Sequence, residues 1–161
     1  MEFSVFSHKG AEAYSFAPSK KNYILISITS VDVAPANICT TLPYLKGILR
    51  LTFDDVECNE PNCMTTEDAM NIISFVNTHI NDIEKIVVHC GAGVSRSAGT
   101  CAALMNIING DDMEIFNNPK YCPNMHCYRT VLETYYGSYN KEAADAKIKQ
   151  NIEVWKKAQD L

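Results

Sequence analysis

The chain has 161 residues, which favours one compact domain because two domains would each fall below the usual size. Hydrophobic residues make up 47% of the chain and charged residues 20%, so a sizeable core can form and wholesale disorder is excluded. The formal net charge of −5 disfavours binding of nucleic acid over an extended surface.

No apolar run approaches the ~20 residues that a membrane-spanning helix needs, so no membrane partner is expected. Residues 1–10 carry polar and charged side chains throughout, unlike a signal peptide. The seven cysteines are an odd number, and some lie inside apolar segments. A secreted disulfide scaffold is shorter and evenly paired, so we expect reduced thiols and a cytoplasmic location.

Three short segments are predicted to be buried strands, because each is apolar, rich in β-branched or aromatic residues and too short for a helix. They are residues 23–28, 47–53 and 85–89, and residues 2–7 form a weaker candidate. A helix is predicted between the second and third strands, over residues 65–80. Its start has the spacing of a capping box, and apolar residues then recur on one face.

Three further helices are predicted after the last strand. The first is apolar nearly all round and ends at Gly110, a glycine C-cap, and the second covers residues 123–136, with Asn124 as a helix-start residue. The third covers residues 140–160. Its apolar stripe of Ile148, Ile152 and Trp155 is explained most simply by docking on the core, and a partner-binding helix is the alternative.

A strand, a helix and a strand in that order imply a right-handed crossover and a parallel sheet. We therefore expect an α/β fold: a central, mostly parallel sheet of about four to five strands, flanked by helices. A phosphate-binding loop is expected between a strand and a buried helix. The whole chain, 1–161, is expected to be a single catalytic domain, with residues 137–161 as a C-terminal helix packed on it.

The segment HCGAGVSRS, residues 89–97, runs from the predicted strand 85–89 into the buried helix. Successive backbone N–H groups in such a turn converge on one point, and the helix N-terminus adds partial positive charge there. Gly91 and Gly93 permit the tight backbone that this cradle needs. An oxyanion is therefore expected to bind the backbone of Gly91, Ala92, Gly93, Val94, Ser95 and Arg96.

Cys90 lies at the mouth of this turn, where the field favours its thiolate and lowers its pKa, and His89 beside it is expected to strengthen the effect. The planar fork of Arg96 can hold two phosphate oxygens and stabilise charge in the transition state. The Ser97 hydroxyl can donate to the Cys90 sulfur when that sulfur becomes the leaving group. Together these residues indicate phosphoryl transfer through a cysteinyl-phosphate. The alternative is a merely structural cysteine in a strand-to-helix turn.

HCGAGVSRS resembles the active-site signature of cysteine-dependent protein tyrosine phosphatases, in which HC is followed by five residues and then by Arg and Ser or Thr. The chain up to about Tyr136 resembles the small dual-specificity branch, and the AGVSRSAG core is closest to that branch. The resemblance implies a nucleophile at Cys90, phosphate binding by residues 91–96, and an acid on an upstream loop. No metal or other cofactor is expected.

Asp54 and Asp55 follow directly after the predicted strand 47–53, at the carboxyl end of a parallel strand where α/β sites form. Strand alternation sends their side chains to opposite sides, so one of them faces the pocket. The family pattern has an Asp about 35 residues before the cysteine, and Asp55 fits this register best. Asp55 is therefore the expected general acid, and Asp54 is the alternative.

The remaining cysteines include two similarly spaced pairs, Cys58 with Cys63 and Cys122 with Cys127. Independent reduced thiols are the main expectation. A redox disulfide and a structural zinc site are the alternatives.

The loop between Cys90 and Arg96 has no Lys, whereas relatives that act on inositol lipids tend to carry one there. With the net charge of −5, this weighs against phosphoinositides and RNA 5′-triphosphate ends. We expect a phosphatase of phosphorylated proteins that acts on phosphotyrosine and, by analogy, on phosphoserine and phosphothreonine. The alternatives are a phosphatase of a non-protein phosphate (an RNA end, a lipid or a small metabolite) and a module that binds phosphorylated partners without turnover. The sequence does not indicate an oligomeric state.

Overall fold

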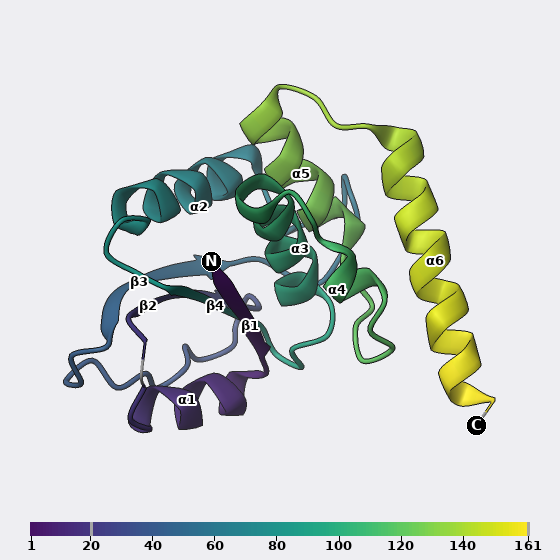
Figure 1. Cartoon of the computed structure of the whole chain (residues 1–161). Helices are drawn as coiled ribbons and strands as arrows, with labels where there is room; N and C mark the ends of the chain where they lie inside the picture. The colour runs from purple at the N-terminus through teal and green to yellow at the C-terminus, as the bar shows by residue number, and fades with distance from the viewer. Residues whose placement is uncertain (20, 161) are drawn as a thin grey trace.

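A four-stranded parallel sheet forms the centre of the computed structural model, which describes residues 1–19 and 21–160 (Figure 1). Its strands are β1 (Glu2–Phe6), β2 (Tyr23–Thr29), β3 (Leu45–Thr52) and β4 (Lys85–His89). The order in the sheet is β1-β4-β2-β3, and each neighbouring pair is parallel. The predicted α/β class and parallel sheet are confirmed, and the weaker strand candidate at the N-terminus is a full edge strand.

The helices are α1 (His8–Phe16), α2 (Thr66–His79), α3 (Arg96–Asn109), α4 (Met113–Phe116), α5 (Met125–Tyr136) and α6 (Lys141–Gln159). The predicted capping box of Thr65 and Asp68 is present at the start of α2. Gly110 ends α3 with a left-handed φ of 74°, as the sequence predicts. Asn124 caps α5 by accepting a hydrogen bond from the backbone N–H of Cys127.

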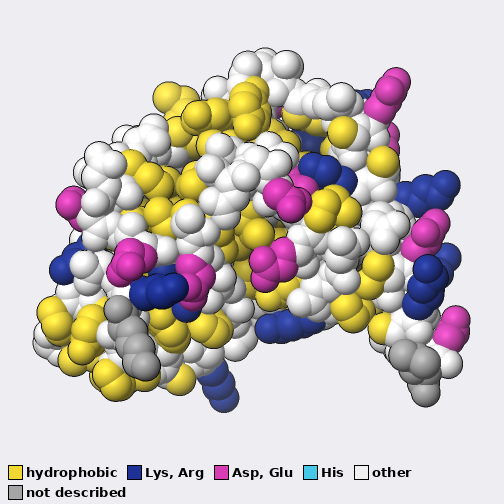
Figure 2. All heavy atoms as spheres, viewed as in Figure 1, with side chains coloured by type: hydrophobic (Ala, Val, Ile, Leu, Met, Phe, Trp, Pro, Cys, Tyr) yellow, Lys and Arg dark blue, Asp and Glu magenta, His cyan; other side chains and the backbone are white. Residues whose placement is uncertain are grey.

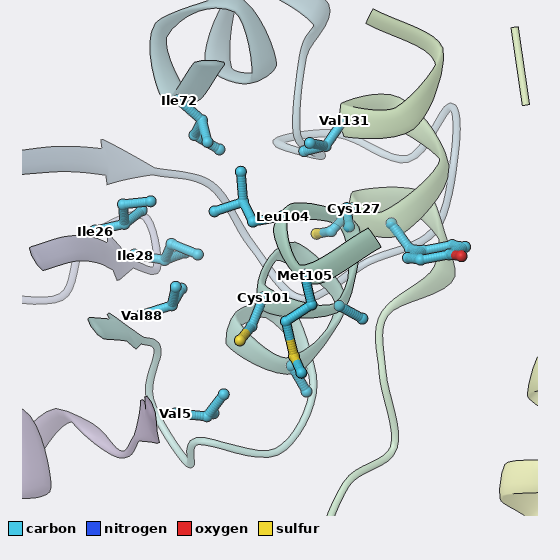
Figure 3. Packing of buried hydrophobic residues seen from close by; sticks show 14 of the residues in the cluster. Val5, Ile26, Ile28, Ile72, Val88, Cys101, Leu104, Met105, Cys127 and Val131 are labelled. Carbon is cyan, nitrogen blue, oxygen red and sulfur yellow. The ribbon is translucent and has the colours of Figure 1, made fainter. Parts of the chain in front are cut away.

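The interior strands β2 and β4 are buried along their whole length, as expected for strands covered on both faces. On one face, Ile26, Ile28 and Val88 pack against α2, α3 and α5 (Figure 3). On the other face, Leu25 and Val87 form a smaller cluster with α1 and the loop after β2. The alternation along each strand therefore divides the core into two layers around the sheet.

Helix α1 was not predicted from the sequence. It buries little apolar surface, because only Ala11 and Ser15 are buried along its length, so no amphipathic stripe marks it. Ser7 caps its first turn by accepting a hydrogen bond from the N–H of Gly10, and Tyr14 packs edge-on against Tyr23. Tertiary packing on the sheet thus stabilises a helix with a weak local pattern.

The apolar stripe predicted for the last helix is wrong in part. Ile148 packs against the core, but Ile152 and Trp155 are 45% and 47% exposed. The side of α6 that faces the protein carries Ala144, Lys147 and Asn151 instead. Hydrogen bonds of Lys147 and Asn151 therefore contribute to the attachment of α6 to the rest of the protein. Charged side chains of both signs follow its outer side at the right of Figure 2. No helix in the described ranges is long and apolar enough to cross a membrane.

Candidate active site

The candidate site lies at the carboxyl edge of the sheet, where β2, β3 and β4 end. The segment of residues 90–95 joins β4 to α3, and we call it the phosphate loop. Residues 54–64 follow β3 and contain both candidate acids, and we call them the acid loop. This is the edge at which parallel sheets form binding sites.

Gly93 is required by the shape of the phosphate loop. Its φ is +71°, which disfavours any residue with a side chain. A Cβ atom there would also lie 2.6 Å from the carbonyl carbon of Phe6 and from the backbone nitrogen of Ser7. The loop therefore rests directly on the junction between β1 and α1.

Backbone contacts hold the phosphate loop from outside. The loop forms backbone hydrogen bonds with the β1–α1 junction on one side. On the other side it forms them with the segment before α5. The bonds are Cys90 N–H to Phe6 O (3.4 Å), His8 N–H to Gly91 O (3.0 Å), Cys122 N–H to Val94 O (3.0 Å) and Asn124 N–H to Ser95 O (3.0 Å). Because the carbonyls point outward, the opposite edges of these peptide planes are left for an anion inside the loop.

Cys90 is buried, and its Sγ lies 3.0 Å from Ser97 Oγ. Burial alone would raise the pKa of the Cys90 thiol. Hydrogen bonds from the Ser97 side chain and from the backbone of Ser97 and Gly93, together with the charge of Arg96, outweigh that effect and lower the pKa below the ordinary thiol value. The loop therefore favours a thiolate at this position.

His89 acts differently from the sequence expectation. Burial lowers the pKa of His89, so the ring is neutral near neutral pH and supplies no positive charge to the thiolate. Its Nδ1 lies 3.1 Å from the Cys90 carbonyl oxygen, which can only accept, so Nδ1 carries the hydrogen. Nε2 then accepts from the Ser27 hydroxyl at 2.6 Å. His89 thus links β2 to the backbone of Cys90.

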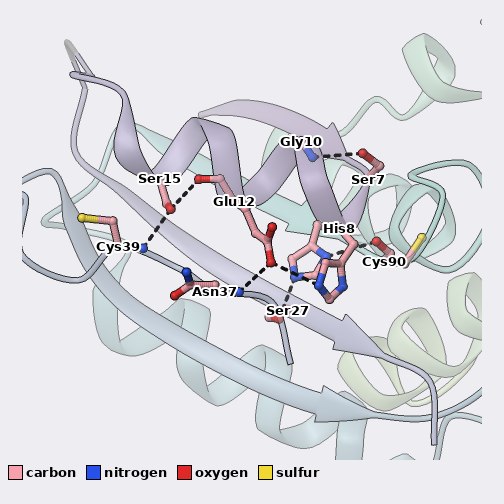
Figure 4. A network of polar contacts seen from close by, with 10 residues as sticks. Ser7, His8, Gly10, Glu12, Ser15, Ser27, Asn37, Cys39 and Cys90 are labelled. Carbon is pink, nitrogen blue, oxygen red and sulfur yellow. Dashed lines mark hydrogen bonds and ion pairs between the residues drawn. The ribbon is translucent and has the colours of Figure 1, made fainter. Parts of the chain in front are cut away.

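Polar side chains lie between α1 and the end of β2, among them His8, Glu12 and Ser27 (Figure 4). The rings of His8 and His89 meet edge to face, with centroids 5.7 Å apart. His8 pairs with Glu12 at 3.3 Å, and Glu12 also accepts the backbone N–H of Asn37 at 2.8 Å. These contacts connect α1, β2 and the loop after β2 behind the phosphate loop.

Arg96 begins α3 and is only 6% exposed. Its Nη1 donates to Phe53 O at 2.7 Å and to Ser30 Oγ at 2.9 Å. Its Nε is buried and has no hydrogen-bond partner within residues 1–19 and 21–160. A buried N–H without a partner lowers the stability of the fold. An anion that accepts a hydrogen bond from this edge of the guanidinium would remove that penalty.

The two candidate acids lie in different surroundings. Asp55 Oδ1 accepts hydrogen bonds from Ser95 Oγ at 2.8 Å and from Asn124 Nδ2 at 2.9 Å, so its carboxylate lies against the phosphate loop. Asp54 Oδ1 accepts instead from the backbone N–H of Val31 at 2.9 Å. The alternation expected at the end of β3 therefore separates the two carboxylates, and the register places Asp55 beside the loop.

Asn124 is the residue whose importance the sequence analysis missed. Besides capping α5, it donates from Nδ2 to Asp55 and to the carbonyl of Val56, so it ties the acid loop to α5. It comes close to α3 because position 99 is glycine, where a Cβ atom would lie 2.2 Å from the Asn124 carbonyl oxygen. The sequence marks Asn124 as a helix-capping residue and Gly99 as a glycine inside a predicted helix. Neither feature predicts the contact of Asn124 with Asp55.

The cysteine pairs do not form a joined unit in the structure. All seven cysteines are free thiols; Cys58 and Cys122 are exposed, whereas Cys127 is buried in the core (Figure 3). Within the described part of the chain, no group of three or more His, Cys, Asp or Glu side chains is arranged to hold a metal ion. Burial strongly raises the pKa of the Cys101 and Cys127 thiols, so both are unreactive.

The site thus brings together a thiol with a lowered pKa, a loop whose carbonyl groups are bonded from outside, a buried guanidinium with a free edge, and a carboxylate. These are the groups that nucleophilic phosphoryl transfer with acid assistance requires. All the predicted site residues lie at this one edge of the sheet. Their assigned roles remain predictions.

Neither a family model nor a curated protein matches the sequence. The fold does resemble solved structures. One is a human tyrosine phosphatase-like serine/threonine/tyrosine-interacting protein, with 16% identity and a TM-score of 0.52 over 94% of this chain and 89% of that chain. Another is Tk-PTP in its active form, with 13% identity and a TM-score of 0.41 over 96% of this chain and 90% of that chain.

Proposed function

We propose that this chain, which has the fold of the cysteine-dependent protein tyrosine phosphatase superfamily, is a phosphoric monoester hydrolase that works through a cysteinyl-phosphate. The observation that carries the proposal is the 2.8 Å hydrogen bond from Ser95 of the phosphate loop to Asp55. It holds a carboxylate beside the loop that carries the thiol of Cys90. A nucleophile and an acid are thus adjacent in the same site.

In the first step, the Cys90 thiolate attacks phosphorus while the bond to the ester oxygen breaks. The S–P bond forms, and the electron pair of the breaking bond goes to the leaving oxygen, which takes a proton from Asp55. Because Asp55 Oδ1 already accepts two hydrogen bonds, the transferable proton belongs on Oδ2. Arg96 and the loop N–H groups stabilise the charge on the transferring phosphoryl group.

In the second step, water attacks the cysteinyl-phosphate and gives a proton to the Asp55 carboxylate. The S–P bond breaks, inorganic phosphate leaves, and the electron pair returns to the sulfur of Cys90. The hydroxyl of Ser97, at 3.0 Å, stabilises the sulfur as a leaving group. Asp55 thereby serves as acid and then as base.

The proposed substrates are phosphorylated proteins, with phosphotyrosine as the main group and phosphoserine and phosphothreonine beside it. The phosphate loop supports this choice because it has no Lys to bind further phosphates, and the net charge is −5. We also propose that residues 1–161 are one catalytic domain in a reducing compartment such as the cytoplasm. A thiolate nucleophile and seven free cysteines suit such a compartment.

A phosphoprotein-binding module without turnover is the second candidate. The resemblance in fold to a human tyrosine phosphatase-like serine/threonine/tyrosine-interacting protein favours it. The presence of Cys90, Arg96 and Asp55 at one site favours turnover, since binding alone needs no nucleophile and no acid.

The test is hydrolysis of p-nitrophenyl phosphate by the wild type and by Cys90→Ser. We expect turnover by the wild type that orthovanadate inhibits, and none by a folded Cys90→Ser variant. Retained activity in Cys90→Ser would refute the cysteine mechanism, and an inactive wild type that binds phosphopeptides would favour the binding module. Phosphopeptides, inositol phosphates and triphosphate-ended RNA, compared by kcat/KM, then identify the substrate class.

A further inference from the structure

We propose that Asp54 and Ser30 are positioning residues that fix the guanidinium of Arg96, so that the adjacent aspartates 54 and 55 have separate roles. Asp55 serves proton transfer, and Asp54 serves anion binding through Arg96. This inference rests on the proposed function of the same site.

Asp54 joins the end of β3 to the segment that follows β2. Its Oδ1 accepts the backbone N–H of Val31 at 2.9 Å, and its Oδ2 accepts from Asn62 Nδ2 at 3.3 Å. Its own backbone N–H donates to the carbonyl of Asn62 at 2.7 Å. Both carboxylate oxygens are thus engaged away from the phosphate loop, which leaves Asp54 poorly placed for proton transfer.

Val31 follows Ser30, which contacts Arg96 directly. Ser30 Oγ accepts from Arg96 Nη1 at 2.9 Å, and the same Nη1 donates at 2.7 Å to the carbonyl of Phe53, the residue before Asp54. The Phe53 N–H also donates to Thr29 O at 3.1 Å, which continues the pairing of β2 with β3. Arg96 Nη1 therefore lies in a clamp made by the ends of these two strands.

The side chain of Asp54 closes this clamp. The pairing of β2 with β3 ends at Thr29 and Thr52 and is extended by the Phe53–Thr29 bond, and the bond of Asp54 to Val31 carries the connection past Ser30. The clamp is needed because a guanidinium binds an oxyanion well only when its planar fork is correctly turned. A charge-assisted hydrogen bond to Ser30 favours one orientation of that fork.

The clamp also decides which edge of Arg96 is free. With Nη1 occupied twice, the edge formed by Nε and Nη2 remains for two phosphate oxygens. Nε is buried and has no hydrogen-bond partner in the described part of the chain. Nη2 lies close to Gly91 of the phosphate loop, because a Cβ atom added to Gly91 would lie 3.5 Å from Nη2. The free edge therefore borders the loop in which the anion binds.

The experiment measures the dissociation constant of inorganic phosphate by calorimetry, and kcat and KM for an aryl phosphate. We expect Asp54→Ala and Ser30→Ala to weaken phosphate binding about tenfold and to raise KM, because each removes one hydrogen bond in the clamp. Asp54→Asn and Ser30→Thr keep an acceptor oxygen and should restore binding to within about twofold of the wild type. Glu57 is an exposed carboxylate in the same acid loop, so Glu57→Ala is the matched control and should leave the phosphate dissociation constant, kcat and KM unchanged.

Unchanged phosphate binding in Ser30→Ala or in a folded Asp54→Ala would overturn the inference. A loss of kcat in Asp54→Asn as large as in Asp55→Asn would also overturn it. If Asp54→Ala does not fold, the comparison of Ser30→Ala with Ser30→Thr decides. A wild type that binds phosphate without hydrolysing any ester would refute the proposed function and leave the binding comparison valid. A wild type that does not bind phosphate would refute the inference itself.

Discussion

Ser95 Oγ donates a hydrogen bond to Asp55 Oδ1 across 2.8 Å, and so connects two loops 40 residues apart in the sequence. Asn124 Nδ2 donates to the same oxygen at 2.9 Å. One carboxylate oxygen is thus held by the phosphate loop and by the start of α5, while the other has no such partner in the described ranges. The first two predictions concern this arrangement.

Asp55→Asn is expected to lower kcat by about 10²- to 10³-fold for substrates with poor leaving groups, because the amide cannot donate the required proton. The loss should be much smaller for p-nitrophenyl phosphate, whose leaving group needs little protonation. A series of aryl phosphates of increasing leaving-group pKa measures this. The prediction fails if the loss is the same across the series.

Asn124→Asp is expected to lower kcat about tenfold, because it removes the donor to Asp55 and places a carboxylate beside it. Aspartate still caps a helix, but the variant loses the bonds to Asp55 and Val56 and buries a carboxylate. The free energy of unfolding should therefore fall by about 2 kcal/mol. Chemical denaturation and steady-state kinetics test the two parts separately. Wild-type kcat in this variant would show that Asn124 does not position the acid.

Gly93→Ala is expected to destabilise the fold by about 2 kcal/mol or more, because it combines a left-handed φ with a clash against the backbone of Phe6 and Ser7. Gly110→Ala is the matched control. Its φ is +74°, but nothing lies within 4 Å of the added Cβ, so we expect a loss of only about 1 kcal/mol. Urea denaturation compares the two, and equal losses would contradict the close contact of the phosphate loop with the β1–α1 junction.

The pH dependence of stability should reflect His89. Burial lowers its pKa in the folded protein, so below the ordinary value of about 6.5 the unfolded chain binds a proton that the folded protein does not. Stability is therefore expected to fall as the pH decreases through this value toward the lower, folded pKa. The free energy of unfolding at a series of pH values measures the slope. His89→Gln should flatten it, and an unchanged slope would count against a neutral buried ring.

The central residues of the site could be predicted because their chemistry is local. Cys90, Arg96 and Ser97 lie within one strand-to-helix turn, and the spacing of a single segment determines their mutual placement. The choice of Asp55 over Asp54 depended on strand register, which the family pattern supplied. In the structure Asp55 contacts Ser95 and Asp54 does not, and the role of Asp55 as the acid stays a prediction.

The contacts that cross the fold could not be predicted. Ser30 reaches the site through the order of the strands, and Asn124 reaches it through the close approach of α3 to α5. The spacing of residues within one segment predicts neither contact. Buried polar contacts explain the error on α6 in the same way. Asn151 is buried because it donates to the carbonyls of Phe116 and Tyr121, whereas a hydrophobic pattern favours the exposed Ile152 and Trp155.

The lowered pKa of Cys90 is the claim on which the proposed mechanism depends. The most direct measurement is the rate of alkylation of Cys90 by iodoacetamide across pH, followed on the labelled peptide by mass spectrometry so that the other six cysteines do not interfere. We expect this rate to reach its plateau with an apparent pKa below the ordinary thiol value of about 8.5, and Ser97→Ala to move that pKa upward. An apparent pKa of Cys90 at or above the ordinary value would contradict the account.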